Sequence, residues 1–215
     1  MIMPAKAKYT ARDKWKMKKW YEVLAPKAFG EVSLGTTPAD DPDKLIGRVV
    51  ETTLYDLTGD ISQVHVKLYF QIVSVEGDKA YARFKGHELA RDYMKSLIRR
   101  KSSKIQGIFD VTTKDGYVVR LTIAALTSFR CKTSQRRAIR RIIKDYIFSK
   151  TPELTMDELV NEILSGRISN EIAELARKIY PMRRVEVYKS KLIMIPTEEG
   201  PKPAVVVSPV QLKSK

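Results

Sequence analysis

The segment from Lys132 to Ile147 limits what this chain can fold into more than any other stretch. At about 100° per residue, its isoleucines and Tyr146 fall on one stripe, and its arginines and lysines crowd onto the adjacent flank. This pattern predicts a helix, capped by Thr133 or Ser134, that buries one face in a core. The cationic flank has almost no acid to neutralise it, and each guanidinium group can bind two phosphate oxygens at once. We therefore predict contact with nucleic acid, and a merely solvated charged face is the alternative.

The net charge of the whole chain also points to an anionic partner. The 215 residues carry 40 Lys and Arg against 25 Asp and Glu, which gives a formal net charge of +15. Such an excess is typical of proteins that meet RNA, DNA or a membrane surface. No apolar run approaches the ~20 residues of a membrane span and no signal segment opens the chain, so we expect neither a membrane-spanning nor a secreted protein. Cys131 is the only cysteine, which rules out a disulfide framework and fits a reducing cytoplasm.

The other patterns alternate between strands and helices. Strands are predicted at residues 45–57, 64–72, 79–85, 107–114, 117–129 and 185–195, with a hairpin turn at Asp115-Gly116. Helices are predicted at residues 88–101 and 132–147, after the Thr155 and Glu158 capping box, and from Ser169 to Pro181. Together they predict an α+β fold in which a mostly antiparallel, β-barrel-like sheet is flanked by helices. We expect a basic N-terminal arm with a short helix and a connector at residues 1–43, a core domain at 44–195, and a Pro-rich, flexible tail at 196–215.

Residues that could carry catalysis or hold a metal are sparse. His65 and His87 are the two histidines, and neither has metal-ligand spacing; we expect His65 at the surface and His87 in a local hydrogen bond. Cys131 has cationic neighbours but is expected to be a buried or idle thiol rather than a nucleophile. The acidic run at residues 40–43 lacks the loop pattern of a calcium site, and no phosphate-binding glycine motif is present. The sequence therefore predicts no enzyme, no catalytic residue, no metal and no cofactor.

Basic residues gather in three clusters, which we predict to bind RNA. In the first, Trp15 and Trp20 lie among lysines, so that a base could stack on an indole; packing of both indoles on the protein body is the alternative. Favourable placement of cations at the end of a helix explains one or two charges of the second cluster, but not four. The predicted RNA-binding residues are Lys14, Trp15, Lys16, Lys18 and Lys19 in the arm, Arg99, Arg100, Lys101 and Lys104 in the second cluster, and Lys132, Arg136, Arg137, Arg140, Arg141 and Lys144 in the third.

Several blocks of sequence, in order and sensibly spaced, follow a known family pattern. They are Lys19 to Pro26 with Phe29, then residues 35–37, 45–51, 54–57, 113–121, 132–141, 179–182 and 185–187. These blocks resemble the S3Ae family of small-subunit ribosomal proteins, which archaea and eukaryotes share. The short basic N-terminus and the limited C-terminal tail resemble the archaeal form.

This resemblance implies a structural protein of the small ribosomal subunit in the cytoplasm. It implies a place on the platform of the subunit, near the mRNA exit and the 3′ end of the small-subunit rRNA. The implied partners are that rRNA and neighbouring ribosomal proteins of the platform, with mRNA at the exit left open and no membrane. The alternatives are a non-ribosomal RNA-binding or RNA-processing subunit and a regulatory mRNA-binding protein.

Overall fold

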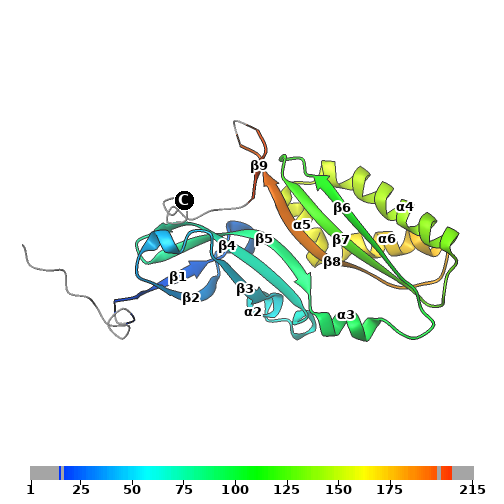
Figure 1. Ribbon diagram of the computed structural model, residues 1–215, viewed down its shortest axis with the longest axis horizontal. Coiled ribbons are helices and arrows are strands. Elements are labelled where there is room, and N and C mark those ends of the chain that lie inside the picture. The colour runs from blue at the N-terminus through cyan, green and yellow to red at the C-terminus, as the bar shows by residue number, and fades with distance from the viewer. Residues whose placement is uncertain (1–14, 16, 198–199, 205–215) are drawn as a thin grey trace, which may run out of the picture. The chain divides into compact units, whose positions relative to one another are not determined.

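The computed structural model describes Trp15, residues 17–197 and residues 200–204, and these form two compact units. The first unit holds the described residues up to Val50 together with Phe70–Arg83; the second holds Glu51–Tyr69 and the described residues from Phe84 onward. Three strands pass from one unit into the other, namely β3 (Val49–Thr53), β4 (Val66–Glu76) and β5 (Lys79–Leu89) (Figure 1). Most of the predicted basic arm and the end of the predicted tail lie outside the described residues. The division of the chain at residues 43 and 195 stays a prediction.

The first unit is built on β1 (Lys19–Leu24). This strand pairs antiparallel with β2 (Ser33–Ala39) and parallel with the start of β5, where Glu22 lies opposite Lys79. Alternate side chains of β1 are buried, because Tyr21 and Val23 face the core while Trp20 faces solvent. Residues 19–24 are therefore a strand and not part of the short helix predicted for the arm, because their aromatic and β-branched residues bury with a period of two. Trp15, earlier in the arm, is helical.

The second unit contains an antiparallel sheet with β8 (Met182–Ile195) near its middle. On one side β8 pairs with β7 (Val118–Thr127), which pairs in turn with β6 (Lys104–Thr112). The end of β5 and the short β9 (Lys202–Pro203) also pair with β8. The prediction of a mixed, mostly antiparallel α+β fold is confirmed. The described strands do not close into a ring, so the sheet is open rather than a barrel.

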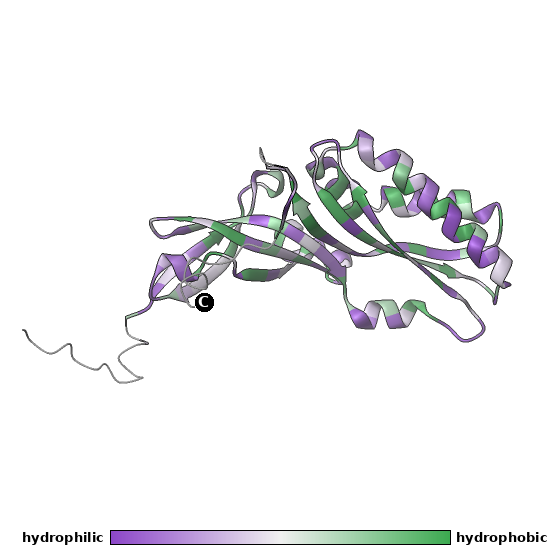
Figure 2. Ribbon diagram, turned by 45° about the horizontal axis from the view of Figure 1, so that its top comes forward, coloured by the Kyte–Doolittle hydropathy of each residue, from purple (hydrophilic) through white to green (hydrophobic). Residues whose placement is uncertain are grey.

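Helices cover one face of this sheet, as Figure 1 shows. They are α4 (Thr133–Lys150), α5 (Met156–Leu164) and α6 (Arg167–Arg177). α4 packs on β6 and α6, and α6 packs on β8. The isoleucine stripe of α4 is buried at Ile139, Ile143 and Ile147, so the predicted inward face of this helix is confirmed. Purple and green bands alternate along α4 in Figure 2, as expected for a helix with one apolar and one charged side.

Shorter elements account for the remaining differences from the predicted pattern. They are α2 (Leu54–Thr58), α3 (Arg91–Leu97) and the 3-10 turns η1 (Lys27–Phe29), η2 (Pro42–Lys44), η3 (Ile61–Gln63) and η4 (Thr151–Glu153). The helix predicted from residue 88 begins only at Arg91, because β5 continues through the buried His87 and Leu89. No helix of the described chain is both long enough and apolar enough to cross a membrane.

Candidate nucleic-acid interface

The cationic side of α4 faces solvent. Arg137, Arg140, Arg141 and Lys144 are all exposed, opposite the buried isoleucines of the same helix. Among the described residues, none of these four side chains forms an ion pair with an acid. The helix thus presents a row of positive charges that are not paired with carboxylates of the described chain and can bind an external anion.

The start of α4 differs from the predicted start. Its N-cap is Lys132, and neither Thr133 nor Ser134 caps it. The backbone N–H of Lys132 donates to Oε1 of Gln135 at 2.9 Å. The Gln135 side chain therefore supplies a hydrogen-bond acceptor at the start of the helix, where the prediction had placed a hydroxyl cap. Thr133 is instead the first helical residue, and its exposed side chain does not cap the helix.

Two arginines of α4 also hold the helix in place. Arg140 Nε donates to the backbone oxygen of Gln106 on β6 at 3.2 Å, and Arg136 donates to Oγ of Ser103 at 3.2 Å. Arg136 is only half-exposed, and its buried Nε has no hydrogen-bond partner in the described structure. Arg136 therefore has a structural role as well as its predicted RNA-binding role, whereas Arg137, Arg141 and Lys144 point outward.

Ser103 brings the second basic cluster to the start of α4. Its buried hydroxyl accepts from the Cys131 N–H at 3.2 Å as well as from Arg136, and its backbone N–H donates to Oγ1 of Thr127 at 3.0 Å. Arg99, Arg100, Lys101 and Lys104 flank this residue and are exposed. The structure thus unites two clusters that are about thirty residues apart in the sequence, 99–104 and 132–144, on one surface of the second unit. We call this surface the α4 cationic face.

The arm cluster belongs to the first unit. Lys14 and Lys16 lie outside the described residues. Trp15 and Trp20 are both 59% exposed, which does not support the alternative that they pack on the protein body. Lys18 Nζ lies 4.3 Å from the centre of the Trp15 ring, and Lys19 is exposed at the start of β1. An exposed indole beside lysines is an arrangement in which a nucleobase can stack, and this stacking stays a prediction.

Some basic residues elsewhere in the second unit differ, because acids neutralise them. Arg120 Nε lies 2.7 Å from Asp110 Oδ1, and Lys189 Nζ lies 2.7 Å from Glu88 Oε2. The Arg120 guanidinium holds the pKa of the Asp110 carboxyl below its ordinary value. Unpaired charge is therefore a feature of the α4 cationic face and not of every basic residue in this unit.

One residue of this surface was missed by the reasoning from sequence. Phe129, in the segment between β7 and α4, is 66% exposed. The predicted strand 117–129 had absorbed it, although β7 ends at Thr127. An aromatic residue between the strand and a run of arginines, next to Arg130, was the available signal.

Comparison with known proteins identifies the family. The family described as the Ribosomal S3Ae family matches residues 6–196. The chain belongs to the S3Ae family. It is 72% identical over 213 residues, covering 99% of this chain and all of the relative, to a protein of Desulfurococcus amylolyticus named small ribosomal subunit protein eS1. Proteins of the same name from Staphylothermus marinus (71% identity, 98% of this chain and 99% of the relative) and Aeropyrum pernix (60%, 94% and 96%) are also similar. These relatives are archaeal, as the resemblance implied.

In this S3Ae chain the three candidate reactive side chains are engaged in packing. His87 is buried, with Nδ1 at 2.6 Å from Ser190 Oγ and Nε2 at 3.0 Å from the Val187 oxygen, and burial lowers its pKa to about 4. Cys131 is buried, and His65 is half-buried with its ring stacked on Tyr93 at 3.8 Å between centres. The local hydrogen-bonding role predicted for His87 is what its contacts show. Within the described part of the chain, no group of three or more His, Cys, Asp or Glu side chains could hold a metal ion.

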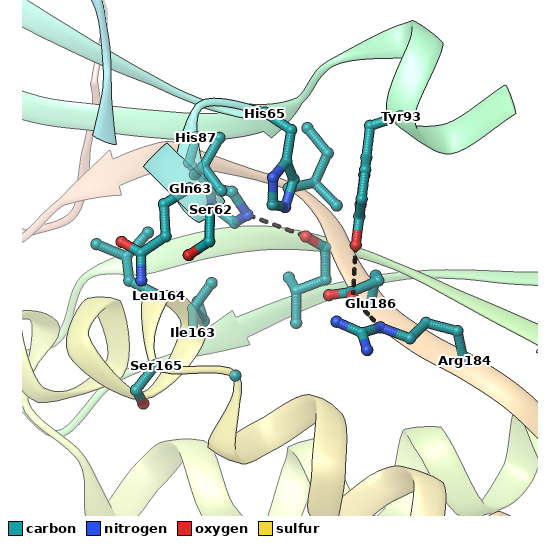
Figure 3. A pocket seen from close by; sticks show the side chains of 14 residues that line it. Ser62, Gln63, His65, His87, Tyr93, Ile163, Leu164, Ser165, Arg184 and Glu186 are labelled. Carbon is teal, nitrogen blue, oxygen red and sulfur yellow. Dashed lines mark hydrogen bonds and ion pairs between the residues drawn. The ribbon is translucent and has the colours of Figure 1, made fainter. Parts of the chain in front are cut away.

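A pocket of about 360 Å³ in the second unit of this S3Ae chain was a second candidate site (Figure 3). Side chains from η3, α3, β8 and the turn between α5 and α6 line it. Figure 3 shows Glu186 between Tyr93 and Arg184: the tyrosine hydroxyl donates to Oε1 at 3.4 Å, and Arg184 Nε lies 2.6 Å from the same oxygen. These contacts engage the Glu186 carboxylate, and both ring nitrogens of His87 already have hydrogen-bond partners, so neither group is free to act as a base toward the pocket.

Proposed function

We propose that the chain is a non-catalytic structural constituent of the small ribosomal subunit that binds the subunit's rRNA through the α4 cationic face. The names of the archaeal relatives, at 71% and 72% identity over nearly their whole length, support the ribosomal role. We choose this surface because Ser103 brings two basic clusters together through its hydrogen bonds with Cys131 and Arg136. The basic residues of these clusters have no ion-pair partner among the described residues. The role places the protein in the cytoplasm, where ribosomes assemble and work.

The finer placement follows the family resemblance. We propose a position on the platform, near the mRNA exit and the 3′ end of the small-subunit rRNA, with ribosomal proteins of the platform as neighbours. mRNA at the exit is a further partner of this proposal. The arm of the first unit, with Trp15, Lys18 and Lys19, would supply a second RNA contact.

Electrostatics would dominate this binding. Each phosphate that a Lys or Arg neutralises releases counterions, so a surface that contacts about eight phosphates should give a log–log salt dependence of affinity with a slope of about 5 to 7 in magnitude. Backbone contact of this kind fixes position on folded RNA without reading its sequence. This is what a structural protein of a ribonucleoprotein requires.

Charge reversal on α4 tests the proposal. Replacing Arg137, Arg140 and Arg141 by Glu should prevent incorporation into small subunits, measured by sucrose-gradient sedimentation after a high-salt wash. The matched control changes three exposed cations outside the α4 cationic face, Lys114, Arg167 and Lys191, to Glu, and it should incorporate normally. Circular dichroism should show that both variants fold, because all six side chains are exposed. The hydrogen bond from Arg140 to the Gln106 oxygen, which the Arg-to-Glu variant loses, also lies at the surface.

The same gradient separates the proposal from its alternatives. Retention of the wild-type protein in the small-subunit peak through the salt wash supports a structural constituent. Recovery only in free fractions would instead support a non-ribosomal RNA-binding or RNA-processing subunit. Normal incorporation of the Arg-to-Glu variant would show that another surface binds the rRNA.

A further inference from the structure

The segment from Ser128 to Cys131 presents an aromatic ring to solvent. Phe129 is 66% exposed, although a phenylalanine gains about 1.5–3 kcal/mol when it is fully buried. Single exposed apolar residues are common on protein surfaces and by themselves indicate nothing. What distinguishes Phe129 is the way its backbone is held and the charge around it.

The backbone of this segment is fixed at four consecutive residues. Ser128 N–H donates to Pro181 O (3.1 Å), Thr127 Oγ1 donates to Phe129 O (2.6 Å), Tyr180 OH donates to Arg130 O (3.2 Å), and Cys131 N–H donates to Ser103 Oγ (3.2 Å). Thr127 and Cys131, on either side of the exposed ring, are buried. A ring on a backbone held in this way loses little conformational entropy when it binds, because the chain is already ordered.

The surroundings of the ring are cationic. Arg130 and Lys132 are exposed beside it, and the Ser103 junction brings Arg99, Arg100 and Lys101 to the same part of the second unit. The two stretches of chain joined at Ser103, residues 93–109 and 116–144, contain no Asp or Glu. A protein partner would have to match this charge with acids, whereas an RNA strand supplies an anion beside every base.

We propose that Phe129 is a stacking anchor for an unpaired base of the bound RNA, while the neighbouring Arg and Lys side chains hold its flanking phosphates. This inference rests on the proposed binding of rRNA and adds the class of ligand that the α4 cationic face takes: a nucleotide outside a helix. Bases within an A-form duplex are stacked on each other and closed to an aromatic side chain, whereas bases in loops and bulges can be splayed onto one. An aromatic beside cations is the arrangement that single-stranded RNA sites use.

Substitution of the ring provides the test. The affinity of the full chain is measured for small-subunit rRNA, for a single-stranded oligonucleotide and for a fully paired RNA duplex. Phe129→Ala and Phe129→Leu should weaken binding to the rRNA and to the single strand by about 5- to 150-fold, the range expected for one lost base–aromatic stack. Affinity for the duplex should stay unchanged. Phe129→Trp should keep or improve binding, because tryptophan is aromatic and can stack on a base. Leucine is as apolar as phenylalanine but cannot stack, so its loss of affinity would separate stacking from simple hydrophobic contact.

The matched control is Tyr55→Ala, which removes another exposed aromatic ring of the second unit, 40% exposed on α2 and outside the α4 cationic face, and should leave all three affinities unchanged. Because the Phe129 ring is two-thirds exposed, every variant should fold, and circular dichroism checks this.

Equal binding of wild type and Phe129→Ala to the rRNA overturns the anchor while leaving the proposed function intact. An equal loss for duplex and single strand overturns stacking as the mechanism. Failure of the wild type to bind rRNA overturns the proposed function itself. Normal rRNA binding with lost incorporation into subunits would assign the ring to a protein partner instead.

Discussion

At the scale of single residues, His87 shows how burial turns a candidate catalytic group into a structural one. Both ring nitrogens lie within hydrogen-bonding distance of β8, at the Ser190 hydroxyl and the Val187 oxygen, and the ring is fully buried. Burial disfavours the charged imidazolium, which is why the pKa falls to about 4. The histidine thus links β5 to β8 as a neutral hydrogen-bonding group.

This burial predicts a pH dependence of stability. Between about pH 6.5 and pH 4 the unfolded chain binds a proton at His87 and the folded chain does not, so falling pH favours unfolding. The free energy of unfolding should fall by about 3 kcal/mol across this range from His87 alone. Urea denaturation at several pH values measures it. His87→Gln should have a flatter profile, since its amide does not titrate while the carboxylates titrate in both proteins; identical profiles would contradict the assignment.

At the scale of elements, the helix starts provide a matched pair of predictions. Thr155 caps α5 in a capping box, in which its N–H donates to Glu158 Oε2 at 2.8 Å and its hydroxyl accepts from the Glu158 N–H at 3.4 Å. Thr155→Ala should therefore lower the free energy of unfolding by about 1 kcal/mol. Thr133→Ala, at the start of α4, should change it by less than about 0.5 kcal/mol, because Thr133 does not cap that helix. Chemical denaturation of both variants decides this, and equal losses would restore Thr133 as a cap.

Elements whose burial follows a local period could be predicted from the sequence. The isoleucines of α4 and the alternating residues of β4, with Leu68, Phe70 and Ile72 buried, were found because the period is visible within one segment. β1 was missed because its partners, β2 and the start of β5, are contributed by other parts of the chain. The union of the two basic clusters could not be predicted for the same reason: it depends on hydrogen bonds that the Ser103 hydroxyl accepts from Cys131 and Arg136, about thirty residues away.

At the scale of the whole molecule, the charge is divided between two units. The arm cluster, with Lys18 and Lys19, belongs to the first unit, and the α4 cationic face belongs to the second. The net charge of +15 sets the overall attraction to RNA, but the salt dependence of affinity counts phosphates contacted. Each neutralised phosphate adds its own share to the slope, so the contributions of the two units add.

The salt slope can therefore assign contacts to each unit separately. Replacing Arg137, Arg140 and Arg141 by Gln should reduce the magnitude of the slope by about 2 to 3, because three phosphate contacts are lost. Replacing Lys18 and Lys19 by Gln should reduce it by about 1 to 2, and the combined variant should show the sum if both units contact the same RNA. Phe129→Ala should lower affinity without changing the slope, since stacking releases no counterions. The measurement is the affinity for small-subunit rRNA over a series of salt concentrations. A slope that does not respond to the lysine substitutions would mean that, of the two units, only the second contacts the phosphates of this RNA.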